Sequence, residues 1–509
     1  MSSLSTSHAA QKTCLQCKSS KKKCDKGLPR CGRCTRLSLK CLNGPTADLE
    51  DTGGNDGTND SRFDEVFRRL EKLEANAFPR NVTTTEASHT QLLSPPGNSE
   101  ATGSTEKGSE NWTLKAAELG SQWMGWMLWG SLLRVLEQTG RTVQSVMERY
   151  FKHIHHWLPM ISRTRVAKEY QGFGELEPNA GLTMLVLAMH LVVTSPSEHP
   201  NSNRNDLSES PWYRACKHHF AQHIGLLEPE LGFIQAGILI ALFEHSQGVK
   251  GRAHTTIGIC ARMAYTLDFD VTVAEHSLTD PGEVQPRDAE IVRTWWSLTV
   301  MDRYINMPPL TVPKQPVVYQ IEGLVSSPLM VENCLIEVEA SRMLAQVQAF
   351  IRIHRREMQT SFNADSVSIM NAINEYMVML KARHDTTGDW TGIAVTLGAA
   401  LQLQCFGVEK RGFLDQETKT LILSLIDELK GVVSQCQNMG GFEEDYLDCI
   451  QPSYISIMYL TGYAYQMVCS QSEQPVDEGE MTQITQMLRS LDLRYKMAGE
   501  AFRALGGVL

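Results

Sequence analysis

The chain has 509 residues, which exceeds the usual size of one folded domain and predicts two or more units joined by linkers. Its net charge of −10 would by itself argue against nucleic-acid binding, but the charge is unevenly distributed. The range Lys12–Cys41 holds ten lysine and arginine residues and one acid, Asp25, so it carries +9 and leaves −19 for the rest. Such a basic end on an acidic body is typical of a chain that binds nucleic acid through that end.

The first residues are polar and lack the apolar stretch of a secretory signal, and we expect residues 1–11 to be disordered. The most apolar run, Leu182–Val193, is too short to cross a bilayer. We therefore expect an intracellular protein with no membrane partner. In that compartment thiols stay reduced, and clustered cysteines are metal ligands before they are disulfides.

Six of the 13 cysteines lie within 28 residues, as two C-x2-C-x6-C repeats joined by six residues. A C-x2-C turn brings two thiolates to one metal ion, and a third cysteine can return along a short helix. Tetrahedral zinc prefers four such sulfurs. Six thiolates hold two zinc ions only if two thiolates are shared. We therefore predict a site for two Zn²⁺ ions with the ligands Cys14, Cys17, Cys24, Cys31, Cys34 and Cys41.

This cysteine pattern, together with Pro29 of the middle loop, resembles the fungal Zn₂Cys₆ binuclear cluster family of transcription factors. The resemblance assigns residues 12–44 to a small DNA-binding domain, the head. It also implies that Cys14 and Cys31 bridge the two metals. A zinc-held domain that binds protein instead of DNA is the alternative.

The lysine-rich stretch between Cys17 and Cys24 begins where a first short helix is expected. A helix N-terminus offers free N–H groups to phosphate, and lysines add charge. The resemblance implies that this helix end reads a CGG triplet, with Lys21 donating to guanine O6 and N7. A solvated face or a nuclear-import signal is the alternative for a lysine run. The predicted DNA contacts are Lys18, Ser20, Lys21, Lys22 and Lys23; at Ser20 the family commonly has a second basic residue, so Ser20 is a candidate phosphate contact.

Residues 45–60 are rich in Gly, Asn and Asp, which predicts a flexible linker. Residues 61–78 then carry apolar side chains at spacings of three and four, a seam of about two heptads. We predict a short coiled coil that pairs two heads into a homodimer. A lone surface helix is the alternative, because coiled coils usually need three or four heptads. The predicted seam consists of Phe63, Val66, Leu70 and Leu73.

Residues 79–111 are rich in Ser, Thr, Gly and Pro and are expected to be disordered. From residue 112 to 509, apolar residues recur with helical period and alternating strand patterns are scarce, which predicts a large all-α domain. Three stretches resemble the fungal transcription factor regulatory domain, also called the middle homology region. These stretches are Tyr150–Arg163, Gly258–Phe269 and Glu290–Pro309, and a later apolar face consists of Ile484, Leu488, Leu491, Tyr495, Ala498, Phe502 and Leu505.

Polar residues of the helical body invite functional interpretations, but structural ones are favoured. Arg293, Asp302 and Arg303 are expected to form buried or half-buried ion pairs that fix helix packing. His153, His155 and His156 lack the spacing of a metal motif and are interpreted as core or surface residues. The remaining cysteines are interpreted as small buried hydrophobic residues: Cys216, Cys260, Cys334, Cys405, Cys436, Cys449 and Cys469.

The resemblance implies a nuclear, zinc-dependent regulator of RNA polymerase II genes that works with the transcription machinery or coactivators. Residues 441–450 and 473–481 are candidate activation segments, with ordinary acidic loops as the alternative. We find no nucleotide-binding or hydrolase motif, and fully thiolate-bound zinc has no open position, so we predict no enzyme.

Size and layout favour an activator of one secondary-metabolite gene cluster. A regulator of nutrient catabolism or of drug and stress responses, or a repressor, is the alternative. An enzyme in the helical body is a distant one.

Overall fold

The computed structural model describes residues 23–25, 31, 35–36, 120–171, 179–195, 198–199, 209–276, 284–307, 313–318, 332–355, 362–387, 390–440, 450–473 and 475–506. The chain divides into two compact units, Met1–Glu106 and Lys107–Leu509. Of the predicted segments, residues 1–11, 45–60, 61–78 and 79–111 lie outside the described residues. The head and the helical body are therefore considered separately.

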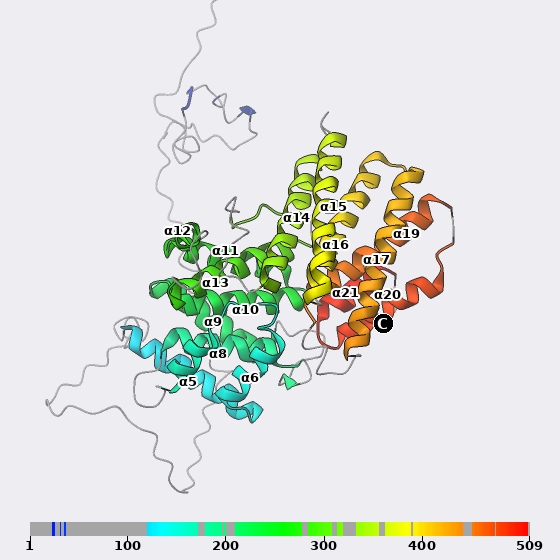
Figure 1. Ribbon diagram of the computed structural model, residues 1–509. Coiled ribbons are helices and arrows are strands. Elements are labelled where there is room, and N and C mark those ends of the chain that lie inside the picture. The colour runs from blue at the N-terminus through cyan, green and yellow to red at the C-terminus, as the bar shows by residue number, and fades with distance from the viewer. Residues whose placement is uncertain are drawn as a thin grey trace, which may run out of the picture. The chain divides into compact units, whose positions relative to one another are not determined.

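The described part of the second unit is built from α-helices, as the helical periodicity predicts. A first group, in cyan and green in Figure 1, comprises α5 (Gly120–Thr139), α6 (Val143–His153), α7 (Arg163–Gln171), α8 (Ala180–Val193), α9 (Pro211–Leu226), α10 (Leu231–Ser246), α11 (Lys250–Thr266), α12 (Phe269–Glu275) and α13 (Pro286–Tyr304). A second group comprises α14 (Glu332–His354), α15 (Phe362–Thr387), α16 (Thr391–Arg411), α17 (Gln416–Gly440), α19 (Ser453–Gln471), α20 (Glu478–Asp492) and α21 (Lys496–Ala504).

The centre of the first group is formed by α8 and α10, which pack against each other. Every described side chain of α8 from Gly181 to Val193 is buried, as is α10 from Gly232 to Ser246. A helix that is apolar on all sides has no solvent face and must lie in the core. Accordingly α10 is also covered by α9, α11 and α13, and α8 by α5, α6 and α9.

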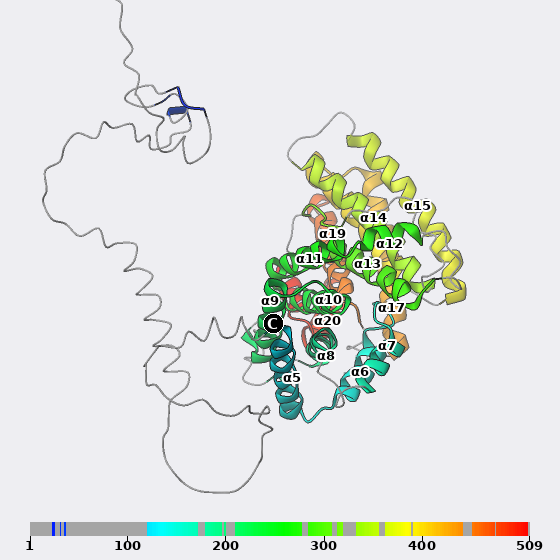
Figure 2. The same ribbon diagram turned by 90° about the vertical axis from the view of Figure 1, so that its left-hand side faces the viewer.

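The second group is centred on α16, which contacts α14, α15, α17 and α19 (Figure 1). By length and composition α16 could cross a membrane, but 89% of its most apolar window is buried inside the unit. A buried core helix can be as long and as apolar as a membrane-spanning helix, so packing inside the unit explains the apolar character of α16. Contacts of α13 with α14 and of α10 with α21 join the two groups. Figure 2 shows α5 and α6 at one end of the unit and α14 and α15 at the other.

Helix boundaries follow local capping chemistry. Thr142 caps α6 by accepting from Ser145 N at 3.1 Å, and the Ser145 hydroxyl oxygen accepts from Thr142 N at 3.1 Å, which satisfies two amides that lack helical partners. Asn179 caps α8 by accepting from the backbone N–H of Leu182. At the other end, α16 stops at Gly412, whose φ of 75° is readily adopted only by glycine.

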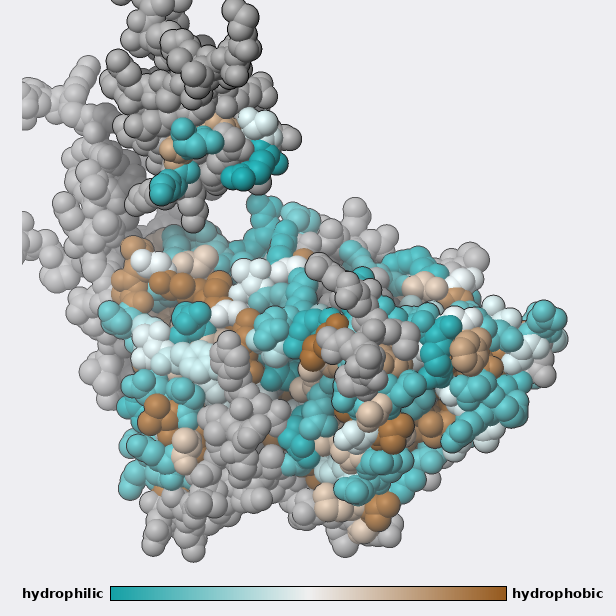
Figure 3. Space-filling model, turned by 90° about the horizontal axis from the view of Figure 1, so that it is seen from above, coloured by the Kyte–Doolittle hydropathy of each residue, from teal (hydrophilic) through white to brown (hydrophobic). Residues whose placement is uncertain are grey.

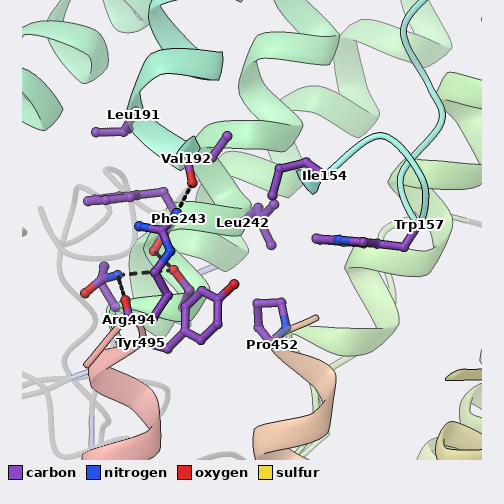
Figure 4. Close-up of a pocket in the computed structure, with 11 residues that line it drawn as sticks. Ile154, Trp157, Leu191, Val192, Leu242, Phe243, Pro452, Arg494 and Tyr495 are labelled. Carbon is purple, nitrogen blue, oxygen red and sulfur yellow. Dashed lines mark hydrogen bonds between the residues drawn. The ribbon is translucent and has the colours of Figure 1, made fainter. Parts of the chain in front are cut away.

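The seven residues of the predicted C-terminal apolar face are all buried, but they lie on two helices and not on one, with Tyr495 and Leu505 at the caps of α21. The chain turns between α20 and α21, and this turn brings Arg494 to the end of α8. The Arg494 guanidinium donates to the carbonyl oxygens of Val192 and Thr194, both at 2.5 Å, which satisfies acceptors that the helix end leaves open. Figure 4 shows Arg494 reaching Val192 beside a small cavity that Trp157 and Pro452 also line.

Apolar side chains are also found on the surface of the described helices. Figure 3 shows them as small brown groups between hydrophilic residues on the face seen from above. The largest exposed fractions belong to Val378 and Leu493, each 70% exposed. Scattered exposed apolar residues are normal for a folded protein and need no partner.

Candidate metal centre and regulatory domain

The described part of the head brings two of the predicted zinc ligands together. Cys24, Asp25 and Cys31 each offer one ligand atom, and these three atoms lie within 4.8 Å of one another. Cys31 is buried and Cys24 is half-buried. Within the described part of the chain, this is the one group of three or more metal-ligating side chains with ligand atoms so close.

A short helical turn follows Cys31. The Cys31 carbonyl oxygen accepts from the Thr35 backbone N–H at 3.0 Å and from the Thr35 hydroxyl at 3.1 Å. Thr35 and Arg36 are helical. The turn lies directly after Cys34, where the C-x2-C-x6-C spacing places a short helix, and it holds the backbone that carries Cys31.

The residues present fit zinc. Two thiolate sulfurs bound to one tetrahedral zinc ion at about 2.3 Å from the metal are about 3.8 Å apart. The Cys24 and Cys31 sulfurs lie within 4.8 Å of each other, close enough for a small movement to bring both to one ion. Thiolates are the ligands that structural zinc sites prefer. The carboxylate of Asp25 was not among the predicted ligands. The sequence does mark Asp25 as unusual, because it is the single acid in the basic stretch and lies next to Cys24.

The other predicted residues of the head are only partly described. Lys23 is described and exposed, which suits a solvent- or DNA-facing side chain. The remaining predicted zinc ligands, DNA contacts and dimer residues lie outside the described residues: Cys14, Cys17, Cys34, Cys41, Lys18, Ser20, Lys21, Lys22, Phe63, Val66, Leu70 and Leu73.

In the helical body, a buried carboxylate holds three distant segments together. Glu290 of α13 accepts from Arg165 of α7 through both oxygens, Oε2 from Nε and Oε1 from Nη2, each at 2.9 Å. Gln235 of α10 donates to Glu290 at 2.9 Å and to the Met160 carbonyl oxygen at 2.9 Å. The backbone N–H of Ser162 donates to Glu290 at 2.9 Å. The first and third stretches that resemble the regulatory domain therefore meet at Glu290.

The electrostatics of this network favour the charged form of Glu290. Burial alone would raise the pKa of Glu290, but the hydrogen bond and charge of Arg165 outweigh it and hold the pKa below its usual value. Sequence reasoning had not selected Arg165, Gln235 or Glu290. Their pairing spans up to 125 residues, and no local spacing signals it.

The ion pair expected at Asp302 and Arg303 is confirmed. Arg303 Nη1 lies 2.7 Å from Asp302 Oδ2, and both side chains are buried. Asp302 also accepts from the backbone N–H of Val317, and Arg303 donates to the Val318 carbonyl oxygen. Gln348 of α14 donates to the carbonyl oxygen of Arg303 at 3.0 Å. The pair thus fixes residues 313–318 and α14 against α13.

Burial was expected of the body cysteines, and the four that are described are buried. His153 is buried, His155 half-buried and His156 exposed, and none of them belongs to a metal-ligating group among the described residues. Burial raises the pKa of the Cys216, Cys260 and Cys405 thiols, as expected of inert core residues. Four of the seven body cysteines are described as buried: Cys216, Cys260, Cys405 and Cys469.

One candidate activation segment has a structural explanation. Asp477 caps α20 by accepting from Gly479 N at 2.7 Å, and Glu480 forms an ion pair with Lys430 of α17. These acids stabilise a helix start, which supports the alternative of an ordinary acidic loop for residues 473–481. Residues 441–449 lie outside the described residues.

Comparison with family models matches both parts of the chain. The fungal Zn(2)-Cys(6) binuclear cluster domain matches residues 12–47, which include both described zinc-ligand candidates. The fungal specific transcription factor domain matches residues 147–307, which include the Glu290 network and the Asp302–Arg303 pair. The chain has the two domains of a fungal zinc-cluster transcription factor.

A relative of this chain is also named as a regulator of transcription. The chain is 22% identical over 374 residues to the depudecin biosynthesis cluster-specific transcription activator DEP6 of Fusarium langsethiae. The aligned region covers 60% of this chain and 58% of the relative, less than two thirds of its length. The family model for residues 147–307 and the relative are both described by a role in transcription.

Proposed function

We propose that the chain is a nuclear, zinc-dependent transcription factor that binds specific DNA sequences and regulates RNA polymerase II genes. The observation that carries the proposal is the presence of both family domains in one chain, the zinc cluster followed by the regulatory domain. The proximity of the Cys24 and Cys31 sulfurs supports zinc binding in the head.

The head would bind two Zn²⁺ ions through six thiolates, two of them shared. Zinc supplies no reaction here; it holds the fold, because a head this small cannot bury enough apolar surface to be stable without metal. The six cysteines of the 12–47 match, Cys14, Cys17, Cys24, Cys31, Cys34 and Cys41, are the proposed ligands.

The head would read CGG-type half-sites in the major groove. A charge of +9 over residues 12–41 supports attraction to the phosphate backbone. Lys21 is the proposed base contact, and the remaining contacts position the head on the backbone. The proposed positioning residues are Lys18, Ser20, Lys22 and Lys23.

Residues 61–78 would pair two heads into a homodimer. A single head that reads three base pairs is weak and unselective, so pairing raises both affinity and selectivity. The seam spacing of Phe63, Val66, Leu70 and Leu73 supports this proposal. The helical body would carry the regulatory input and contact coactivators or the transcription machinery.

The target is proposed to be one secondary-metabolite gene cluster. Support comes from the relative, which is named a cluster-specific activator of depudecin biosynthesis. Control of nutrient catabolism or of drug and stress responses, and repression in place of activation, are the alternatives that the experiment distinguishes.

The proposal is tested by genome-wide chromatin occupancy of the tagged full-length protein, with a Cys17→Ala variant as the control. We expect Cys17-dependent peaks over CGG-containing promoters within one contiguous gene set, whose transcripts fall when the gene is deleted. Scattered peaks would favour a broad metabolic or stress regulator, and rising transcripts a repressor. Absence of Cys17-dependent peaks in all growth conditions tested would contradict DNA binding through the head.

A further inference from the structure

A large cleft opens on the first group of helices. It lies where α7, α13 and the start of α8 and α10 meet, and its volume is about 720 Å³. Clefts that hold small ligands usually measure about 300–1,000 Å³. We call it the α7–α13 cleft.

The floor of the α7–α13 cleft is formed by polar groups that are already satisfied. Arg165 donates to both oxygens of Glu169 at 3.1 Å, to Gln235 at 2.9 Å and to Glu290 at 2.9 Å. The carboxylates of Glu169 and Glu290 therefore share one guanidinium, which offsets one of their two negative charges and engages the oxygens of both.

The rim of the cleft carries cations that are not engaged in this way. Lys168 of α7 and Arg287 in the first turn of α13 both line the cleft and are exposed. Neither has a hydrogen bond or ion pair with another described residue. Among the acids that line the cleft, Glu230 is the one without such a partner in the described part of the chain. Two cations against one acid leave a positive rim.

The cleft also has an apolar wall. Leu231 and Leu267 are half-buried and leave apolar surface open to the cleft, whereas Phe269 and Ile291 beside them are almost fully buried. A ligand that is only a small anion would leave this wall wet. A ligand with an apolar body would cover it and gain the hydrophobic contribution of the area removed from water.

From the engaged floor, the positive rim and the apolar wall, we propose that the α7–α13 cleft binds a small amphipathic anion, with a carboxylate or phosphate head at Lys168 and Arg287 and an apolar body against Leu231 and Leu267. Only the role of this ligand rests on the proposed function: in a transcription factor, it is the small molecule that regulates the helical body. The binding itself does not depend on that function.

The test uses the full-length protein and four probes with one ten-carbon chain: decanoate, decyl phosphate, decylamine and decanol. Binding is measured by calorimetry and by the shift of the melting temperature, with inorganic phosphate and acetate as head-only probes. We expect the two anions to bind at least tenfold more tightly than the amine or the alcohol. The head-only probes are expected to bind at least tenfold more weakly than the corresponding amphipathic anions. The ratio of decanoate to decyl phosphate distinguishes a carboxylate from a phosphate ligand.

Charge variants locate the site. Lys168→Glu/Arg287→Glu is expected to weaken binding of the amphipathic anions at least tenfold, whereas Arg134→Glu, an exposed change on α5, leaves it unchanged. Lys168→Gln/Arg287→Gln serves if the reversed variant fails to fold. Equal binding of all four probes, full binding of the head-only probes, or unchanged anion affinity in both double variants would overturn the proposal. If the wild-type protein binds the amphipathic anions but does not bind CGG-containing DNA, the proposed function is contradicted and the ligand site is not.

Discussion

At Glu290, a carboxylate that is 1% exposed stays charged because Arg165, Gln235 and a backbone amide surround it. Burying a charge is costly unless it is paired and hydrogen-bonded. The arrangement therefore stabilises the helix packing only while every partner is present. Removing one partner leaves the other buried without compensation.

The first prediction concerns this pair. Arg165→Met should lower the free energy of unfolding of the helical body by about 3 kcal/mol, because Glu290 remains buried without its cation. Arg163→Met, two residues away, removes only an exposed contact of its guanidinium with the Phe151 ring, worth about 0.5–1 kcal/mol. Urea unfolding of both variants measures the difference; equal midpoints would contradict a strong Glu290 pair.

The zinc ligands lead to a second prediction. Cys17→Ala should remove one thiolate ligand that is not shared between the two ions and unfold the head, because thiolate–zinc bonding supplies its folding energy. Cys405→Ala, in buried α16, is the matched cysteine control and should keep the zinc content of the wild type. Metal analysis measures zinc per chain, with two ions expected for the wild type. A Cys17→Ala protein with unchanged zinc and fold would refute the ligand assignment.

The third prediction separates base from phosphate contact. Lys21→Ala should weaken binding to a CGG site by about 1–3 kcal/mol if Lys21 makes a bidentate contact with guanine. Binding to DNA without CGG should change much less. Titrations of both DNAs at one fixed salt concentration measure the two losses. An equal loss on both would assign Lys21 to a phosphate.

At the scale of single helices, the sequence was informative about element type and less so about contacts. Helical periodicity predicted the all-α body. The complete burial of α8 and α10 was not predicted, although their apolar stretches are consistent with it. The break between α20 and α21 was not predicted, because the apolar positions continue in register on both sides of it. The cysteine spacing placed Cys24 and Cys31 in one predicted cluster of six ligands, and these two lie close together. Arg165 and Glu290, in contrast, are joined only by tertiary packing.

The fourth prediction uses two helical glycines with opposite surroundings. A Cβ at Gly237 of α10 would collide with the Cys260 sulfur and lie 2.7 Å from Cζ of Phe220, whereas one at Gly130 of α5 meets nothing within 4 Å. Gly237→Ala should therefore destabilise the body by about 1–3 kcal/mol. Gly130→Ala should stabilise it by up to about 1 kcal/mol through helix propensity.

Thermal unfolding of the two alanine variants and the wild type measures both effects. A higher melting temperature of both variants would show that helix propensity, and not the close approach of α9 and α11 to α10, decides the outcome at Gly237.

At the scale of the whole helical body, the two groups of helices are joined by polar contacts as well as by apolar packing. Arg494 connects the α20–α21 turn to α8, and Tyr495 donates to the Ile450 carbonyl oxygen at 2.8 Å. Near this junction lie His190 and His199, both buried. Burial, together with the charge of Arg141, lowers the pKa of His190 to about 3, and burial with the charge of Arg494 lowers that of His199 to about 4.

These histidines predict an acid-sensitive junction. Between pH 6.5 and about 4 the unfolded chain takes up protons at His190 and His199 that the native protein does not bind, so stability is full above pH 6.5 and falls as the pH drops. Each such histidine contributes a slope of up to about 1.4 kcal/mol per pH unit. His190→Gln should reduce the slope, and His218→Gln, at an exposed position of α9, should not. Unfolding free energies measured from pH 7.5 to pH 5 test this. If His190→Gln leaves the slope unchanged, other groups cause the acid sensitivity. The junction then depends on Arg494 alone and not on these histidines.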